Sequence, residues 1–406
     1  MATSPEPSGD QGATTRERRG HYEERTWAPD FERARGGRVA AGRYRAFVAD
    51  PIGDLDPALN SSTFAIAERA GAQVRELNSR EPALVPLEGL ARQLLRSEAL
   101  ASSRIEGLNL SHRKLAQAAL EGDQGDHKAQ EVLANTRAME EAVRIGAETK
   151  RITPQDIADI HAALAVVPPL DRIAGQFREE QGWIGGPSPP QAEFVPAPPE
   201  HVRPLVEDLC EFANRDDIPP VVQAAIAHSQ FETIHPFGDG NGRVGRCLIH
   251  VLFRRRGIAT RYVPPVSLVL EANKDAYIAG LERYRADLLD DWVAQFARAV
   301  EAAAANAENF SDRIAALQSD WLERVGPTRR DAVALKVIEN LPSFPFITTK
   351  IVQELTGRSD VAALRGLARL EDAKILTRHR NKRKGDSWEA KELFGLLNEF
   401  EDAVSG

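Results

Sequence analysis

The stretch His235-Pro236-Phe237-Gly238-Asp239-Gly240-Asn241-Gly242-Arg243-Val244-Gly245-Arg246 places a histidine, an acid, an amide and two arginines close together. Its glycines let the backbone approach a ligand, and Pro236 prevents helix directly after the histidine. The apolar residues that follow, as far as Phe253, predict a buried helix whose first N–H groups favour an anion. Arg243 and Arg246 are three positions apart and therefore share a helical face. The stretch predicts a polyphosphate site beside a titratable base. A loop that merely turns a corner would not account for the histidine and the arginines.

The bulk properties of the chain restrict its class. A length of 406 residues predicts two or three domains, and 42% hydrophobic with 28% charged residues is typical of a soluble globular protein. No long apolar run or apolar signal core is present, so neither a membrane span nor secretion is expected. Cys210 and Cys247 lack metal-like spacing and fit a reducing compartment, which favours a cytoplasmic protein. The net charge of −8 requires any nucleic-acid site to be local.

The quoted stretch resembles, position for position, the signature of the Fic family, His-x-Phe-x-(Asp/Glu)-Gly-Asn-Gly-Arg-x-x-Arg. Most positions of this signature are specified, so it is much more specific than a lone G-x-G-x-x-G. The resemblance covers about residues 40–400. It implies a mainly α fold: a Fic helical-bundle core with a small β-hairpin flap, an N-terminal helical region and a C-terminal winged helix-turn-helix. It also implies a protein adenylyltransferase that moves AMP from ATP to a Ser, Thr or Tyr hydroxyl of a target protein or of the chain itself.

The resemblance implies roles for the signature residues, and each role has a chemical reason. His235 is expected to titrate near neutrality and to be the general base. Asp239 is expected to hold Mg²⁺, a hard cation that bridges phosphates. The expected nucleotide contacts are Gly240, Asn241 and Gly242 on the α-phosphate, Arg243 on the β-phosphate, Arg246 on the γ-phosphate, and Tyr277 near the base. Family members often use a tyrosine pair for the base, and Ala276 stands beside Tyr277 here, so the nucleotide preference stays open.

Upstream lies Ser102-Ser103-Arg104-Ile105-Glu106-Gly107. By itself it predicts a helix end capped by Gly107, with Glu106 as a solvated acid. One class of Fic proteins carries Ser/Thr-x-x-x-Glu-Gly/Asn as an inhibitory motif, which Ser102, Glu106 and Gly107 fit. The resemblance implies that Glu106 pairs with Arg246. A guanidinium cannot make its bidentate pair with a carboxylate and with a γ-phosphate at the same time, so this pairing would block the nucleotide.

The chain divides into four predicted parts. Residues 1–38 are polar and aperiodic, which predicts a flexible tail. Residues 39–148 form the N-terminal helical region with the inhibitory helix, residues 149–315 the catalytic core, and residues 327–406 the winged helix-turn-helix. His161, His228 and Glu232 are expected to support the fold rather than to react.

Two short apolar stretches, Trp183-Ile184 and Phe194-Val195, flank a Gly/Pro-rich turn and predict a two-stranded hairpin. A simple surface excursion is the alternative. The resemblance implies a flap whose backbone pairs with the target protein by strand addition.

The C-terminal pattern of three helices and a basic hairpin is typical of a winged helix-turn-helix. Its wing carries Arg378, His379, Arg380, Lys382, Arg383 and Lys384, which can meet phosphates. Arg358, Arg365 and Arg369, on the predicted recognition helix, are compatible with DNA. A protein-binding or packing module is the alternative.

Two other functions stay open at this point. Glu106 can orient a water that removes AMP from a modified protein, which is the reverse activity. The chain can also be a DNA-binding regulator whose nucleotide site is a sensor. A homodimer is compatible with either.

Overall fold

The computed structural model describes residues 19–29, 41–80, 87–122, 126–327, 332–381 and 385–404. It is mainly helical with small antiparallel sheets, so the predicted fold class is confirmed. Among the helices described, none combines the length and the apolar character needed to cross a membrane.

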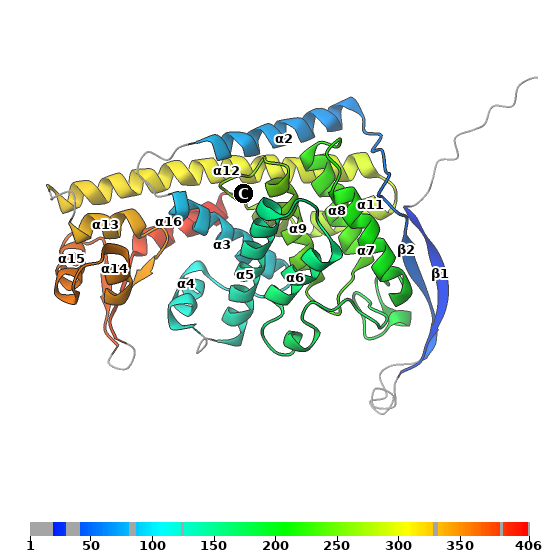
Figure 1. Ribbon diagram of the computed structural model, residues 1–406, viewed down its shortest axis with the longest axis horizontal. Helices are drawn as coiled ribbons and strands as arrows, with labels where there is room; N and C mark the ends of the chain where they lie inside the picture. Colours follow the sequence, from blue (N-terminus) through cyan, green and yellow to red (C-terminus); the bar gives the residue numbers. More distant parts are fainter. Residues whose placement is uncertain are drawn as a thin grey trace, which may run out of the picture.

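The longest element is α12 (Leu289–Val325), whose 37 residues correspond to a helix of about 55 Å. It runs along one side of the molecule with α2 (Ser61–Ser79) beside it (Figure 1). Its buried stripe continues through Gln318 and Trp321 to Val325, and Gly326, at φ 71°, ends it. The helix continues without a break past residue 315, the predicted end of the catalytic core, toward the C-terminal module.

The two helices that flank the signature form the centre of the core. Residues 221–234 of α8 (Pro220–Ile234) are all buried, and α9 (Asn241–Arg255) is almost entirely buried. Helix α5 (His127–Glu148) crosses α9 so closely that a Cβ added at Gly146 would lie 2.5 Å from the carbonyl oxygen of Val251. The other helices of the core are α3 (Leu87–Ile105), α4 (His112–Glu121), α6 (Pro154–Leu164), α7 (Pro199–Ala213), α10 (Val266–Ala272) and α11 (Lys274–Arg285), with 3₁₀ turns at Leu170–Ile173 and Pro189–Gln191.

The N-terminal segment contains an antiparallel hairpin of β1 (Gly20–Trp27) and β2 (Gly42–Ala49). The prediction of a flexible tail over residues 1–38 is therefore wrong for residues 20–27. The ring of Tyr22 packs on that of Phe47 at 5.2 Å between centroids, and the backbones form a full ladder. The sequence of this strand has few apolar residues, and its partner β2 lies well beyond it in the chain, so neither an apolar alternation nor a short turn indicated a hairpin. The rest of that predicted tail lies outside the described residues, apart from Arg19, Ala28 and Pro29.

The predicted flap hairpin is reduced to one antiparallel bridge, Ile184–Phe194. The amide of Ile184 donates to the carbonyl of Phe194 at 2.8 Å, and the amide of Phe194 donates back at 3.2 Å. The Gly/Pro-rich sequence between them prevents a longer ladder. On its other side the segment joins the N-terminal hairpin, since the Phe47 amide donates to the Val195 carbonyl at 2.8 Å.

The C-terminal module combines three helices with a three-stranded sheet of order β3-β5-β4. Its elements are α13 (Val333–Asn340), β3 (Phe346–Ile347), α14 (Thr349–Thr356), α15 (Asp360–Asp372), β4 (Thr377–His379) and β5 (Ser387–Glu389). A last helix, α16 (Lys391–Asp402), packs back on α12, where the rings of Phe310 and Phe400 stack at 4.4 Å. The winged helix-turn-helix assignment stays a prediction, and Lys382, Arg383 and Lys384 lie outside the described residues.

Candidate active site

The signature loop lies between α8 and α9. His235 ends α8 in the left-handed region (φ 51°), since Pro236 cannot continue the helix. Gly240, at φ 78°, precedes α9 and has no side chain to cap it. The first-turn N–H groups of α9 therefore stay available for an anion.

Arg178 holds this loop from outside the signature. Its Nε donates to the carbonyl of His235 at 2.8 Å, and Nη2 donates to that of Ile234 at 3.3 Å. Its own amide donates to the carbonyl of Pro236 at 2.9 Å. This role could not be predicted from the sequence, because Arg178 stands in an irregular segment without a motif.

Phe237 anchors the loop in the core. The ring of His161 stacks on it at 3.9 Å, in line with the predicted packing role of that histidine. The side chain of Asn241 accepts from the Phe237 amide at 2.8 Å and donates to its carbonyl at 2.9 Å. The carboxamide of Asn241 thus closes the loop with one of its two N–H donors. Its predicted contact with the α-phosphate stays a prediction, and its backbone N–H lies at the start of α9.

The imidazole of His235 is held neutral. Burial lowers its pKa to about 4, and the nearby Arg178 acts in the same direction. Its Nδ1 is buried without a hydrogen-bond partner among the described residues. A neutral ring at pH 7 is the form that can take up a proton.

Arg246 makes three hydrogen bonds to the end of α3. Its Nε donates to Ser102 Oγ at 2.9 Å, and its Nη2 donates to the Ser102 carbonyl at 2.9 Å and to Glu106 Oε1 at 2.7 Å. Ser102 and Glu106 are four positions apart and so lie on one face. Gly107, at φ 84°, then ends the turn. The structure brings Ser102 and Glu106 of the predicted inhibitory motif into contact with Arg246.

The carboxylate of Glu106 lies where an anion would bind α9. A Cβ added at Gly242, in the first turn, would be 2.1 Å from Glu106 Oε1. Burial by itself would raise the pKa of Glu106, but Arg246, with Arg243 and His235, lowers it below its usual value. The charged form of Glu106 is therefore favoured.

Arg243 differs from Arg246 because its charge is poorly matched. It is 4% exposed, and its Nε and Nη1 have no hydrogen-bond partner among the described residues. The carboxylate paired with it, Glu131, lies 3.9 Å away. A buried guanidinium with unused donors is costly and is suited to an incoming phosphate.

Glu106, His235, Gly242 and Arg246 line a cleft of about 550 Å³, whereas Asp239, Gly240, Asn241 and Arg243 are not among its lining residues. Tyr277 lines it, and its hydroxyl lies 2.9 Å from Nε2 of His228. The flap contributes Ile184 and Phe194, and the N-terminal hairpin contributes Tyr22 and Phe47, which the sequence did not suggest. Two flap residues, Trp183 and Val195, are absent from the lining. Trp183 instead packs edge-on against Trp27, with ring centroids 6.5 Å apart.

Asp239 is exposed, and its Oδ1 accepts the Gly240 amide at 2.5 Å. No group of three or more metal-binding side chains occurs in the described part of the chain. Protein-bound Mg²⁺ usually keeps several waters and takes only one or two carboxylates together with substrate phosphates. A single carboxylate beside a phosphate site fits that pattern.

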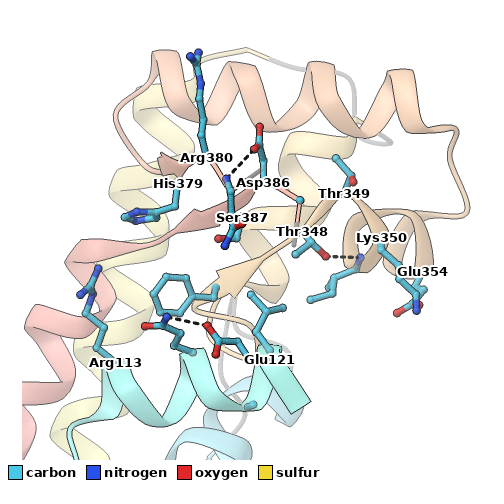
Figure 2. A pocket seen from close by; sticks show the side chains of 17 residues that line it. Arg113, Glu121, Thr348, Thr349, Lys350, Glu354, His379, Arg380, Asp386 and Ser387 are labelled. Atoms are coloured by element: carbon cyan, nitrogen blue, oxygen red, sulfur yellow. Dashed lines mark hydrogen bonds and ion pairs between the residues drawn. The ribbon is translucent and has the colours of Figure 1, made fainter. Parts of the chain in front are cut away.

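Several cations of the C-terminal module are used internally. Arg378 pairs with Asp386 at 2.5 Å, His379 lies 2.6 Å from Glu389, and Arg369 donates to the Val325 carbonyl at 2.9 Å. Arg365 and Arg380 are exposed. A second cleft, of about 840 Å³, lies between α4 and this module, and charges of both signs line it (Figure 2). None of the predicted active-site residues lies there.

Comparison with known proteins gives two family matches. Residues 151–253 match the Fic/DOC family, and residues 65–144 match the Fic/DOC family N-terminal region. The chain is 33% identical over 134 residues to the protein adenylyltransferase fic-1 of Caenorhabditis elegans. The matched segment makes up 32% of this chain and 24% of that protein. It is 36% identical over 116 residues to the protein adenylyltransferase Fic of Aedes aegypti, and here the matched segment makes up 28% of this chain and 21% of that protein. The matching segment thus spans about a quarter of the length of these relatives.

The fold is similar to the crystal structure of a Fic family protein from Desulfovibrio desulfuricans G20. The TM-score is 0.52 at 20% identity, over 82% of this chain and 97% of that one. At this identity the likeness concerns the fold alone.

Proposed function

This chain contains a Fic/DOC domain preceded by its family N-terminal region, and from that premise we propose that it is a self-inhibited protein adenylyltransferase. Its substrates would be Mg-ATP and a hydroxyl side chain of a target protein or of the chain itself. The named relatives, which are protein adenylyltransferases, support the class of reaction.

In the proposed reaction the target hydroxyl attacks the α-phosphorus of ATP. A new oxygen–phosphorus bond forms, the bond to the oxygen that bridges to the β-phosphate breaks, and pyrophosphate leaves. The hydroxyl proton passes to the neutral ring of His235. The N–H groups at the start of α9 and Arg243 would bind the phosphates, and Asp239 would hold Mg²⁺, which supplies further charge neutralisation.

One observation carries the proposal of self-inhibition: Glu106 Oε1 lies 2.7 Å from Arg246 Nη2 and also against the first turn of α9. Arg246 and the first turn of α9 would also have to bind the end of a triphosphate. Because Glu106 occupies both, a correctly placed triphosphate requires it to move.

The first test is intact mass spectrometry of the protein with Mg-ATP, together with an assay of pyrophosphate release. Glu106→Gly is expected to gain AMP and to release pyrophosphate far faster than wild type. Adding His235→Ala to it should abolish both. Glu121→Gly is the matched control, because Glu121 is the last residue of α4 and, like Glu106, precedes a glycine, but it does not line the active-site cleft. If Glu106→Gly neither gains AMP nor releases pyrophosphate with any nucleoside triphosphate, the proposal is wrong.

The reverse activity has a specific observation in its favour. The side chain of Glu106 is 39% exposed and lines the same cleft as His235, so a water can reach it. In that case Glu106→Gly would lose the hydrolysis of AMP from a modified protein. Comparing that hydrolysis in the wild type and in Glu106→Gly distinguishes the two directions.

A further inference from the structure

Residues 102–107, here called the inhibitory turn, are held from outside the active site by the C-terminal module. Arg104 lies between Ser102 and Glu106, and its Nη2 is 3.0 Å from Glu401 Oε2 at the end of α16. The same carboxylate lies 2.6 Å from Nε2 of His112, the first residue of α4. The side chains of Arg104 and Glu401 are only 15% and 14% exposed, so this ion pair is largely shielded from water.

The geometry of the turn links the Arg104–Glu401 ion pair to the position of Glu106. Side chains two positions apart on a helix point in nearly opposite directions, so Arg104 faces away from the side on which Ser102 and Glu106 meet Arg246. Last turns of helices fray easily, and α3 ends at Ile105, one residue before Glu106. The placement of Glu106 therefore depends on whatever anchors the outer side of this turn. Arg104 also donates to the Leu110 carbonyl at 3.0 Å, which ties the turn to the connection that follows it.

Helix α16 is itself fixed on the core helix α12. Asn306 donates to the carbonyl of Phe400 at 3.1 Å, and Trp321 donates to Glu392 at 2.6 Å. Arg313 and Glu399 form an ion pair at the same interface. Glu401 is thus presented to Arg104 by a helix that is fixed along its length.

A second carboxylate of the module repeats the pattern nearby. Glu389 of β5 is 1% exposed, accepts from Arg113 Nε at 2.5 Å and lies 2.6 Å from His379. Arg113 and His379 are seen at the cleft between α4 and the module (Figure 2). The module therefore holds the segment 104–113 at two places.

We propose that Glu401 is a positioning residue of the self-inhibited state, which keeps Glu106 on Arg246 by anchoring Arg104. The C-terminal module then serves as the outer support of the inhibitory turn. A change that moves α16 lowers the cost of withdrawing Glu106 and raises the affinity for ATP. This inference rests on the proposed function of Glu106.

The test measures the binding of Mg-ATP by calorimetry, with His235→Ala in every protein so that ATP is not consumed. Glu401→Gln, which keeps the size of the side chain but removes its charge, is expected to tighten ATP binding by at least about fivefold, the lower end of typical coupling between sites. Asp402→Asn is the matched control on the same helix, and it should leave the affinity within about twofold, because the side chain of Asp402 is exposed and Arg104 pairs with Glu401. In the Glu106→Gly background Glu401→Gln should have no effect.

An equal affinity in wild type and Glu401→Gln would overturn the inference, as would the same gain in the Glu106→Gly background. Arg104→Gln breaks the pair from its other end and should give the same gain, so the test does not depend on one variant folding. The labelling of Glu106→Gly with AMP is a separate measurement. If it fails, the proposed function is wrong, whereas a flat calorimetric result beside successful labelling contradicts only the role of Glu401.

Discussion

Arg246 donates three hydrogen bonds, from Nε and Nη2, to Ser102 and Glu106 of the same turn. Its neighbour on the same face, Arg243, is equally buried but has unused donors. One arginine is therefore occupied by the protein and the other is ready for a ligand. This difference supports a site that is complete but blocked.

The pKa of His235 gives a prediction at the residue scale. Because burial lowers the pKa to about 4, the ring should show no titration between pH 8 and pH 5 in the protein without nucleotide. An NMR titration, assigned by the resonance that is lost in His235→Ala, measures this. The unfolded chain binds the proton near pH 6.5, so this residue reduces folding stability as the pH falls below that value. A midpoint near 6.5 in the folded protein would contradict the buried neutral ring.

Site residues that belong to a short local motif could be predicted from the sequence. The signature and the Ser102–Glu106 spacing both come from local sequence, and the structure brings them together. The hydrogen bonds between the side chain of Asn241 and the backbone of Phe237 were not predicted, because they depend on how the loop folds back on itself. Arg178 and Glu401 were missed, since their contacts join positions far apart, such as Arg104 and Glu401 at a separation of 297 residues.

At the scale of elements, the crossing of α5 and α9 sets the position of the signature helix. It depends on Gly146, where a Cβ would lie 2.5 Å from the Val251 carbonyl and 2.7 Å from Arg254 Cβ. The backbone of Val251 and the Cβ of Arg254 cannot move aside as the end of a flexible side chain could. The close approach therefore requires glycine.

Gly146→Ala is expected to destabilise the protein by about 1–3 kcal/mol, the usual cost of overpacking. Gly395→Ala is the control, because Gly395 lies inside α16 with nothing within 4 Å of an added Cβ. That substitution should leave stability unchanged or raise it by about 0.5–1 kcal/mol, since alanine favours helix. Denaturant unfolding of both variants tests this. If Gly146→Ala is as stable as Gly395→Ala, the close crossing is not a constraint.

Helices with a clear apolar period were predicted well, whereas short strands were not. The strand β1 was missed because its alternation is polar and its stability comes from pairing with β2 and from the contact of Tyr22 with Phe47. The flap was predicted as a hairpin on its apolar residues, but Gly and Pro between them leave a single bridge.

At the scale of the whole molecule, α12 joins the helical core to the C-terminal module (Figure 1). The core packs on its first half, and α16 packs on its second half through the Phe310–Phe400 stack. No sequence pattern revealed that the module returns to the inhibitory turn. That return depends on how helices are arranged in space.

Phe400→Ala tests this connection. Phe400 is 2% exposed, so its truncation should cost about 3–5 kcal/mol and loosen α16. Hydrogen exchange is expected to become faster in α16 and also at residues 100–107, because Glu401 then holds Arg104 less firmly. Leu364→Ala, at an exposed position of the same module, should change neither region. Faster exchange confined to α16 would show that the module and the inhibitory turn are independent.

The central claim is that Glu106 and the end of a triphosphate compete for Arg246, and ATP affinity tests it most directly. Calorimetry should compare His235→Ala with His235→Ala/Glu106→Gly in Mg²⁺, where no AMP is transferred. The account predicts that removing the carboxylate tightens ATP binding by about tenfold or more, which corresponds to about 1.4 kcal/mol. Equal affinities in the two proteins would contradict it.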